Sequence, residues 1–268
     1  MTSIEPAVPT PTPSQDSSDK MSFFDHLAEL RQRLLWSLLA IAIGSAVGLA
    51  YAEEAFAFLA QPMMRAFAQA GYSQQQMIFT NPLGALRLYI SVGLYLGIVL
   101  ALPVVLYQLW RFVAPGLYRN ERRAIGLFLL SSIFLFVAGT AFGYYILLPV
   151  TLTFLISLQG NFTPMISINE YFDVVLVILL GLGVVFQLPI LIFLLSLFGI
   201  VTPGFLWRNF QYAVLLIALV AALVTPTTDV VTMVVFMVPM LGLYVLGIGV
   251  SYLVVRRRSA RETAWTRQ

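Results

Sequence analysis

The stretch Phe112-Val-Ala-Pro-Gly-Leu-Tyr-Arg-Asn-Glu121-Arg-Arg123 is a short polar link between two long apolar blocks, residues 84–110 and 123–148. A bilayer has a hydrocarbon core about 30 Å thick, which about 20 consecutive apolar residues can cross as a helix. Each block is therefore long enough to cross a membrane, and the link between them must lie at a membrane face. This arrangement predicts an all-α membrane protein.

The same alternation of apolar blocks and short links continues along the chain. Of its 268 residues, 60% are hydrophobic and 10% are charged, whereas a soluble domain carries about 25% charged residues. The mean hydropathy is +0.89. We predict a polytopic membrane protein with six transmembrane helices, over residues 34–51, 84–110, 123–148, 171–198, 209–224 and 231–254.

The basic residues indicate how these spans are oriented. With the N-terminus in the cytoplasm, only Arg65 and Arg87 fall on the outer side. All other basic residues are then cytoplasmic: Lys20, Arg31, Arg33, Arg111, Arg119, Arg122, Arg123, Arg208, Arg256, Arg257, Arg258, Arg261 and Arg267. Cytoplasmic loops are enriched in Lys and Arg. We therefore predict that both termini are cytoplasmic.

The two ends of the chain differ from the middle, residues 21–255, which we expect to form the six-helix transmembrane domain. Residues 1–20 contain several prolines among Ser and Thr, and this composition predicts a disordered cytoplasmic tail rather than a cleavable signal peptide. Residues 256–268 form a basic cytoplasmic tail, whose arginines could touch anionic lipid. Cysteine is absent and His26 is the only histidine, so thiol chemistry is excluded and a metal site is not expected.

Two connections on the outer side are too rich in apolar residues to be simple turns. Residues 52–83 include an apolar run before Pro62, which suggests a short interfacial helix, and residues 149–170 begin at a proline. We expect these two segments to pack together as an outer cap. The fifth span, residues 209–224, is only about 24 Å long as a helix, so it predicts local thinning of the bilayer.

Two acidic side chains lie on the same predicted membrane face. Glu29 could form an ordinary helical ion pair with Arg33, four residues later, worth about 0.2–0.5 kcal/mol. Glu121 could simply stabilise the start of the next helix by about 0.3–1 kcal/mol. Phe112, Pro115 and Tyr118 in the same link fit recognition better than mere connection. The alternative function for the two carboxylates is to receive a ligand that carries paired cations.

Further polar residues lie within or beside the apolar blocks. Gln187 in the fourth span must face protein or a wet cavity, and its amide could satisfy the carbonyl that Pro189 frees near residue 185. Arg87 could reach the membrane surface without any functional role, and Asp229 could cap the sixth helix. Motifs of membrane proteases and ATPases are absent, so we predict no catalytic residues and no enzyme activity.

Several of these segments, taken in order, resemble one known family, that of the TatC subunit of the twin-arginine protein translocase. They are His26-Leu-Ala-Glu29-Leu-Arg31-Gln-Arg33, the run from Pro103 to Arg123, Phe186-Gln-Leu-Pro189 and Thr225-Pro-Thr-Thr-Asp229. The resemblance covers about residues 21–255. It implies six helices in a cupped arrangement whose concave face receives the apolar region of a twin-arginine signal peptide.

The resemblance also implies roles for single residues. Glu29 and Glu121 would meet the signal arginines, and the rest of the docking patch would be Phe112, Leu117, Arg31 and Pro115. Structural or assembly roles would fall on Pro62, Pro103, Tyr144 and Asp229. Gln187 stands where many members carry glutamate, so a proton-carrying role at this position is not expected.

The implied partners are twin-arginine signal peptides of folded precursors, single-span subunits of the TatA and TatB type, further copies of this chain, and membrane lipids. Nucleic acid and cofactors are not expected, and the implied location is the cytoplasmic membrane of a prokaryote. Two other functions stay open on the residues alone. One is a secondary transporter or channel for a small solute, and the other is a purely structural membrane scaffold.

Overall fold

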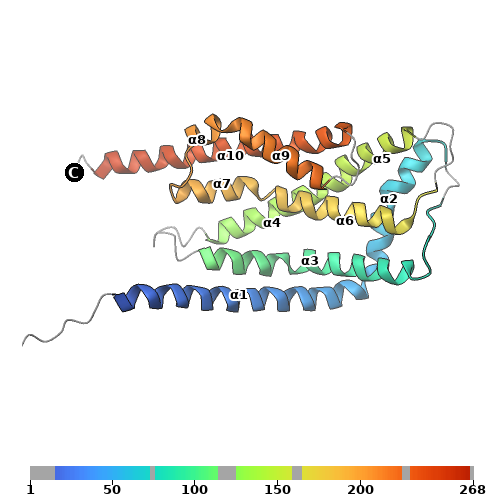
Figure 1. Cartoon of the computed structure of the whole chain (residues 1–268), viewed down its shortest axis with the longest axis horizontal. Coiled ribbons are helices and arrows are strands. Elements are labelled where there is room, and N and C mark those ends of the chain that lie inside the picture. Colours follow the sequence, from blue (N-terminus) through green and yellow to red (C-terminus); the bar gives the residue numbers. More distant parts are fainter. Residues whose placement is uncertain (1–15, 73–75, 114–124, 159–164, 225–229, 266–268) are drawn as a thin grey trace, which may run out of the picture.

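The computed structural model describes residues 16–72, 76–113, 125–158, 165–224 and 230–265, and these are almost entirely helical. Most helices run along the long axis of the molecule, and one crosses them at one end (Figure 1). The helices are α1 (Asp16–Ala50), α2 (Ala52–Gln69), α3 (Gly84–Val113), α4 (Ile125–Phe142), the π-helical turn η3 (Gly143–Leu147), α5 (Leu148–Ser157), α6 (Ile168–Val185), α7 (Leu188–Leu197), α8 (Pro203–Arg208), α9 (Phe210–Val224) and α10 (Val230–Trp265).

The described helices agree with the predicted apolar segments. Five stretches are long and apolar enough to cross a membrane: Leu27–Ala50, Gly84–Phe112, Gly126–Ser157, Ile168–Leu197 and Val230–Arg256. The remaining predicted span is the shorter apolar helix α9, of 15 residues. The all-α fold is therefore confirmed, whereas the count of six spans and their orientation stay predictions.

Several predicted boundaries were wrong. The third span continues through Pro149 to Ser157, so the first part of the predicted outer loop is helix α5. Pro149 lies just after the π-helical turn η3, in a helix that continues without interruption to Ser157. The fourth span is interrupted at Phe186 and Gln187, between α6 and α7. Helix α1 begins at Asp16 and α10 ends at Trp265, and the tails at residues 1–20 and 256–268 stay predictions.

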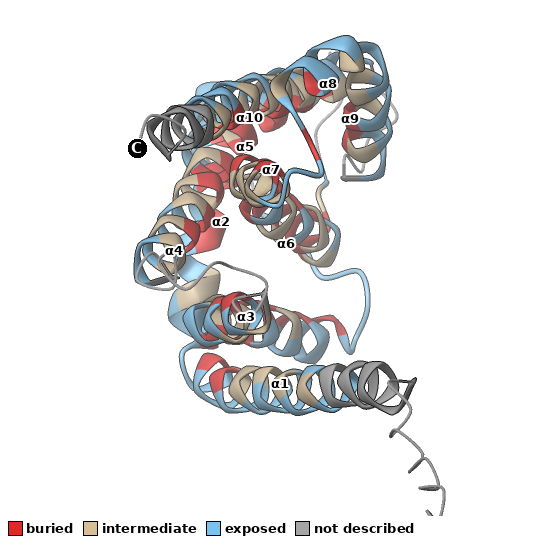
Figure 2. Cartoon of the chain, turned by 90° about the vertical axis from the view of Figure 1, so that its left-hand side faces the viewer, coloured by how far each residue is buried: buried red, intermediate tan, exposed pale blue. Residues whose placement is uncertain are grey.

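Seen end-on, α1 lies at one edge of the arrangement and α9 at the other, with α6 and α7 between them (Figure 2). The main hydrophobic core surrounds α6 and includes residues of α2, α3, α5, α9 and α10. Its largest fully buried side chains include Phe172, Leu182 and Phe236. In a second, smaller cluster, Ile192 of α7, Val201 and Leu206 of α8 pack together, with Tyr244 and Ile248 of α10 against them.

Helix α1 is held differently, because it packs almost entirely against α3. Two glycines on each helix form the contact, namely Gly44 and Gly48 on α1 and Gly93 and Gly97 on α3. A Cβ placed on Gly44 would lie 2.5 Å from the carbonyl oxygen of Gly97. Small residues let two membrane helices approach closely, so this seam requires glycine.

The predicted cap is confirmed at the end of the bundle where α2 lies, which we call the capped end. Helix α2 packs against α3 and α5, and the Ile78 amide donates to the Ile166 carbonyl at 3.0 Å. The Ile168 amide donates back to the Ile78 carbonyl at 2.9 Å. These bonds tie the segment after α2 to the segment before α6. We call the opposite end, where α3 ends and α4 begins, the loop end.

Candidate functional site

At the loop end, Glu29 is paired with a neighbour on its own helix. The Nε of Arg33 donates to Glu29 Oε1 at 3.0 Å, and one terminal nitrogen of Arg33 forms an ion pair with the same oxygen. The expected helical ion pair is therefore present. The Glu29 side chain remains 33% exposed, and neither bond uses its second oxygen, Oε2. This carboxylate can still accept a further cation.

Arg33 also connects this pair to α3. Its Nη1 donates to Gln108 Oε1 at 3.4 Å, and Gln108 lies one turn before Phe112 at the end of α3. Phe112 is half-buried. The structure thus brings the Glu29 carboxylate and the helix that leads into the 112–123 link to the same place.

The other predicted docking residues are not brought together by the described structure. Arg31 is exposed and makes no described contact with Glu29. Pro115, Leu117 and Glu121 lie outside the described residues, as does Asp229. Their expected roles stay predictions.

Two hydrogen bonds to Ser132 of α4 connect this end of α3 with the break between α6 and α7. The indole Nε1 of Trp110 donates to Ser132 Oγ at 2.9 Å, and the Gln187 amide donates to the Ser132 carbonyl at 3.0 Å. Trp110 stacks on Phe128, with ring centroids 5.4 Å apart. Gln187 therefore links the break between α6 and α7 to α4, and its described partner is not the carbonyl near residue 185 that the sequence suggested.

Trp110 and Ser132 were missed by the sequence analysis, although a signal for them exists. Both lie eleven residues from Glu121, one before it and one after it. Two antiparallel helices joined by a short link bring such equidistant positions side by side. Pairing residues symmetrically about the link would have found this contact.

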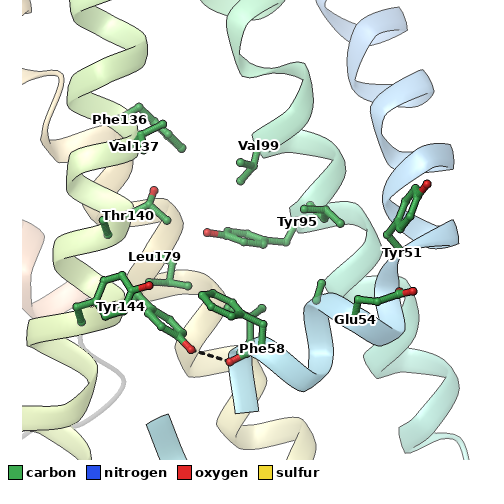
Figure 3. Close-up of a pocket in the computed structure, with 15 residues that line it drawn as sticks. Tyr51, Glu54, Phe58, Tyr95, Val99, Phe136, Val137, Thr140, Tyr144 and Leu179 are labelled. Atoms are coloured by element: carbon green, nitrogen blue, oxygen red, sulfur yellow. Dashed lines mark hydrogen bonds between the residues drawn. The ribbon is translucent and has the colours of Figure 1, made fainter. Parts of the chain in front are cut away.

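Pro62 and Tyr144 are related by a hydrogen bond at the capped end. Pro62 lies inside α2 and has no N–H, so the carbonyl of Phe58, four residues earlier, loses its helical partner. The Tyr144 hydroxyl donates to this carbonyl at 2.7 Å, and the two rings stack 4.4 Å apart (Figure 3). The Tyr171 hydroxyl donates to the next carbonyl, that of Leu59, at 2.7 Å.

Tyr144 and Tyr145 belong to the π-helical turn η3. Such turns insert an extra residue into a helix and occur often at functional sites. Pro103 plays a comparable part in α3, because it removes the helical partner of the Val99 carbonyl. Val99 and Tyr144 both line the same cavity.

This cavity of about 510 Å³ lies between α2, α3 and α4, with Leu179 of α6 at its base (Figure 3). Its walls are mostly apolar. Tyr95 from α3 reaches toward Thr140 on α4, and both hydroxyls are buried. The two hydroxyls lie close to each other across the space between α3 and α4. An occupant of this cavity would meet mostly hydrocarbon walls.

Arg87 forms an ion pair, in addition to any contact with the membrane surface. Its Nη2 lies 2.6 Å from Oδ2 of Asp173, which joins α3 to α6 at the capped end. Among the described residues, no group of three or more His, Cys, Asp or Glu side chains could hold a metal ion. The fold and these features define a polytopic helical membrane protein with an apolar cavity at its capped end and the Glu29 carboxylate beside the link at its loop end.

Comparison with known proteins identifies the family. Residues 25–239 match the family described as Sec-independent protein translocase protein (TatC). The TatC protein of Koribacter versatilis is 45% identical over 261 residues, which cover 97% of this chain and 96% of that protein. The TatC protein of Aquifex aeolicus is 35% identical over 247 residues, covering 91% of this chain and all of that protein.

A solved structure agrees. The crystal structure of the twin-arginine translocase receptor TatC superposes with a TM-score of 0.77 at 36% identity, covering 86% of this chain and 99% of that chain. The chain belongs to the TatC family, and it is a protein-transport component of the twin-arginine translocase. The alternative of a solute transporter finds no support.

Proposed function

We propose that this chain binds twin-arginine signal peptides at its loop end and holds their apolar region against the interior of the helical arrangement. The observation that carries this proposal is the position of Glu29, half-exposed beside the end of α3, in a chain that matches the TatC family from residue 25 onward. Glu121, in the link that follows α3, would supply the second carboxylate.

Charged contacts and apolar contacts contribute differently to binding of the signal peptide. A guanidinium and a carboxylate form a strong, often bidentate hydrogen-bonded pair. In an exposed setting such a pair contributes only about 0–1 kcal/mol. Two carboxylates therefore give selectivity, and burial of the signal's apolar region must give most of the affinity.

Arg33 limits which oxygen of Glu29 is free to bind a signal arginine. It occupies Glu29 Oε1, so a signal guanidinium would bind Oε2 or displace Arg33. Because Arg33 also bonds to Gln108, displacement would loosen α1 from the end of α3. Arg31, Phe112, Pro115 and Leu117 would complete the patch.

The proposal places the chain in the cytoplasmic membrane of a prokaryote, with six spans and both termini in the cytoplasm. The positive-inside distribution of arginine supports this orientation. We further propose single-span TatA- and TatB-type subunits and other copies of this chain as partners. Pro62, Pro103, Tyr144 and Asp229 would act in structure or assembly rather than in docking.

The test is a binding assay with signals that carry either an Arg-Arg or a Lys-Lys pair. Glu29→Gln and Glu121→Gln should each lower binding of the Arg-Arg signal by up to about fivefold, since 1 kcal/mol corresponds to about that factor, and should remove the preference over Lys-Lys. Glu53→Gln, an exposed acid at the capped end, is the matched control and should change neither. If both loop-end variants keep the full preference for arginine, the carboxylates do not select the signal.

A further inference from the structure

Two cavities at the capped end share one wall. The apolar cavity of about 510 Å³ described above lies on one side of Tyr144 and Tyr145. On the other side is a cavity of about 170 Å³, lined by Arg65 and Gln69 of α2, by Thr153 of α5 and by the same two tyrosines. A mostly hydrocarbon chamber thus adjoins a small chamber that contains a cation.

Arg65 differs from the other basic side chain at this end. Arg87 is neutralised by Asp173, whereas the described partner of Arg65 is the neutral amide oxygen of Gln61, at 3.2 Å. The acid Glu54 lies eleven residues earlier on the same helix, which places its backbone about 16 Å away. The charge of Arg65 is therefore not compensated by a described carboxylate.

The wall between the chambers is held in place. Tyr144 is fixed by its hydrogen bond to the Phe58 carbonyl and by stacking on the Phe58 ring. Tyr145 packs edge-on against Tyr144, with centroids 4.9 Å apart, and is largely exposed. A ligand that passes over the exposed Tyr145 could occupy both chambers at once.

We propose that these two chambers bind one anionic phospholipid, with its phosphate at Arg65 and an acyl chain in the apolar chamber. The volume of the apolar chamber falls within the range of about 300–1,000 Å³ that is usual for ligand sites. Glu54 lines the far side of that chamber and repels an anion there, so the phosphate belongs at Arg65. The lipid would tie α2 to α4 and α5 at the capped end.

The headgroup decides which lipid binds. An acyl chain is already in hydrocarbon when it is in the bilayer, so its transfer into the chamber adds little selectivity. A basic side chain near the membrane surface contributes about 1 kcal/mol toward an anionic lipid. The site should therefore prefer phosphatidylglycerol over phosphatidylcholine with identical chains by about fivefold.

The experiment counts lipids bound to the purified full chain by native mass spectrometry, with the two lipids offered at equal concentration. We expect the fivefold preference in the wild type and in Arg87→Gln, and its loss in Arg65→Gln. An unchanged preference in Arg65→Gln, or an equal loss in Arg87→Gln, would overturn the proposal. Because Arg65 and Arg87 are both exposed, neither variant should impair folding.

Two further arms separate the headgroup from the chain. Glycerol phosphate without acyl chains should not compete at millimolar concentration, and competition would indicate a simple anion site instead. Ala141→Phe, at a lining position of the apolar chamber, should reduce binding of both lipids while the melting temperature stays within a few degrees. Undiminished lipid binding in this variant would place the acyl chain elsewhere and overturn the proposal.

Discussion

Helices α1 and α6 are both apolar enough to cross a membrane, yet they are held in opposite ways. In the most apolar window of each span, 11% of the residues are buried inside the protein for Leu27–Ala50 in α1, and 44% for Ile168–Leu197, which comprises α6 and α7. Among the described residues, α1 packs mainly against α3 and makes a minor contact with α2, whereas α6 packs against α3, α4 and α9. Apolar composition predicts that a segment enters the membrane, and it says little about how many neighbours the segment has.

The two helices can be held so differently because their surroundings are lipid rather than water. Lipid tails are as apolar as leucine, so no hydrophobic force drives one membrane helix against another. Attachment then depends on close packing and on hydrogen bonds. Helix α1 uses the glycine seam, and α6 uses a set of large side chains that interlock with several helices.

The largest effect should come from breaking the glycine seam between α1 and α3. A side chain at Gly97 would overlap the backbone of Ser45, so Gly97→Leu should separate α1 from α3 and cost about 3 kcal/mol of unfolding free energy. It should also displace Glu29 and weaken signal binding. Gly249→Leu is the control, because a Cβ at that position meets no described atom within 4 Å apart from its chain neighbours and the nearby backbone of its own helix. Equal unfolding free energies for the two variants would show that the seam does not hold α1.

A somewhat smaller effect should follow from matched truncations in the two helices. Leu182→Ala on α6 removes a fully buried side chain and should cost about 2–3 kcal/mol of unfolding free energy. This is the lower part of the range for core leucines, because a leucine side chain gains little free energy on moving from lipid into the protein interior. Leu38→Ala on α1, where the side chain is 53% exposed, should cost less than about 0.5 kcal/mol. Unfolding titrations in mixed micelles would measure both, and similar losses would contradict the proposed difference in packing.

The smallest expected effect is at the capped end, where α2 contacts the first turn of α6 through Tyr171 and Phe172. Tyr144→Phe leaves the Phe58 carbonyl without its hydroxyl partner and should cost about 1–2 kcal/mol. In a Pro62→Ala background the restored N–H at residue 62 can bond that carbonyl within the helix, so the same substitution should cost about 1 kcal/mol less. A double-mutant cycle of unfolding free energies measures this coupling. Additive effects would show that Pro62 does not create the need for Tyr144.

The general fold was largely predictable because it follows from local composition. The positions of the apolar segments, the helix in residues 52–83, the packing of the two outer segments as a cap and the shortness of residues 209–224 were all confirmed. The end of the third span at Pro149 was wrong, and the interruption of the fourth span, residues 171–198, at Gln187 was not predicted. Proline ends a helix only when its missing N–H breaks a needed bond, and this depends on which neighbours take over.

The candidate site was predictable only in part. Glu29, Gln187, Pro62 and Tyr144 were each identified from the sequence as residues of interest, but their partners were not. The bond from Tyr144 to Phe58 spans 86 residues, and the one from Gln187 to Ser132 spans 55. Contacts at such separations depend on how helices are arranged in three dimensions.

The amino-acid sequence by itself determined which segments are membrane helices, where the arginines gather and which family the motifs resemble, since these properties depend on neighbouring residues along the chain. Only the tertiary structure decided that α1 is attached by a glycine seam and that a hydroxyl from η3 replaces the bond lost at Pro62. It also decided that Arg65, which has no carboxylate partner among the described residues, adjoins an apolar chamber. These features depend on distances between helices, which are set by the packing of the whole bundle.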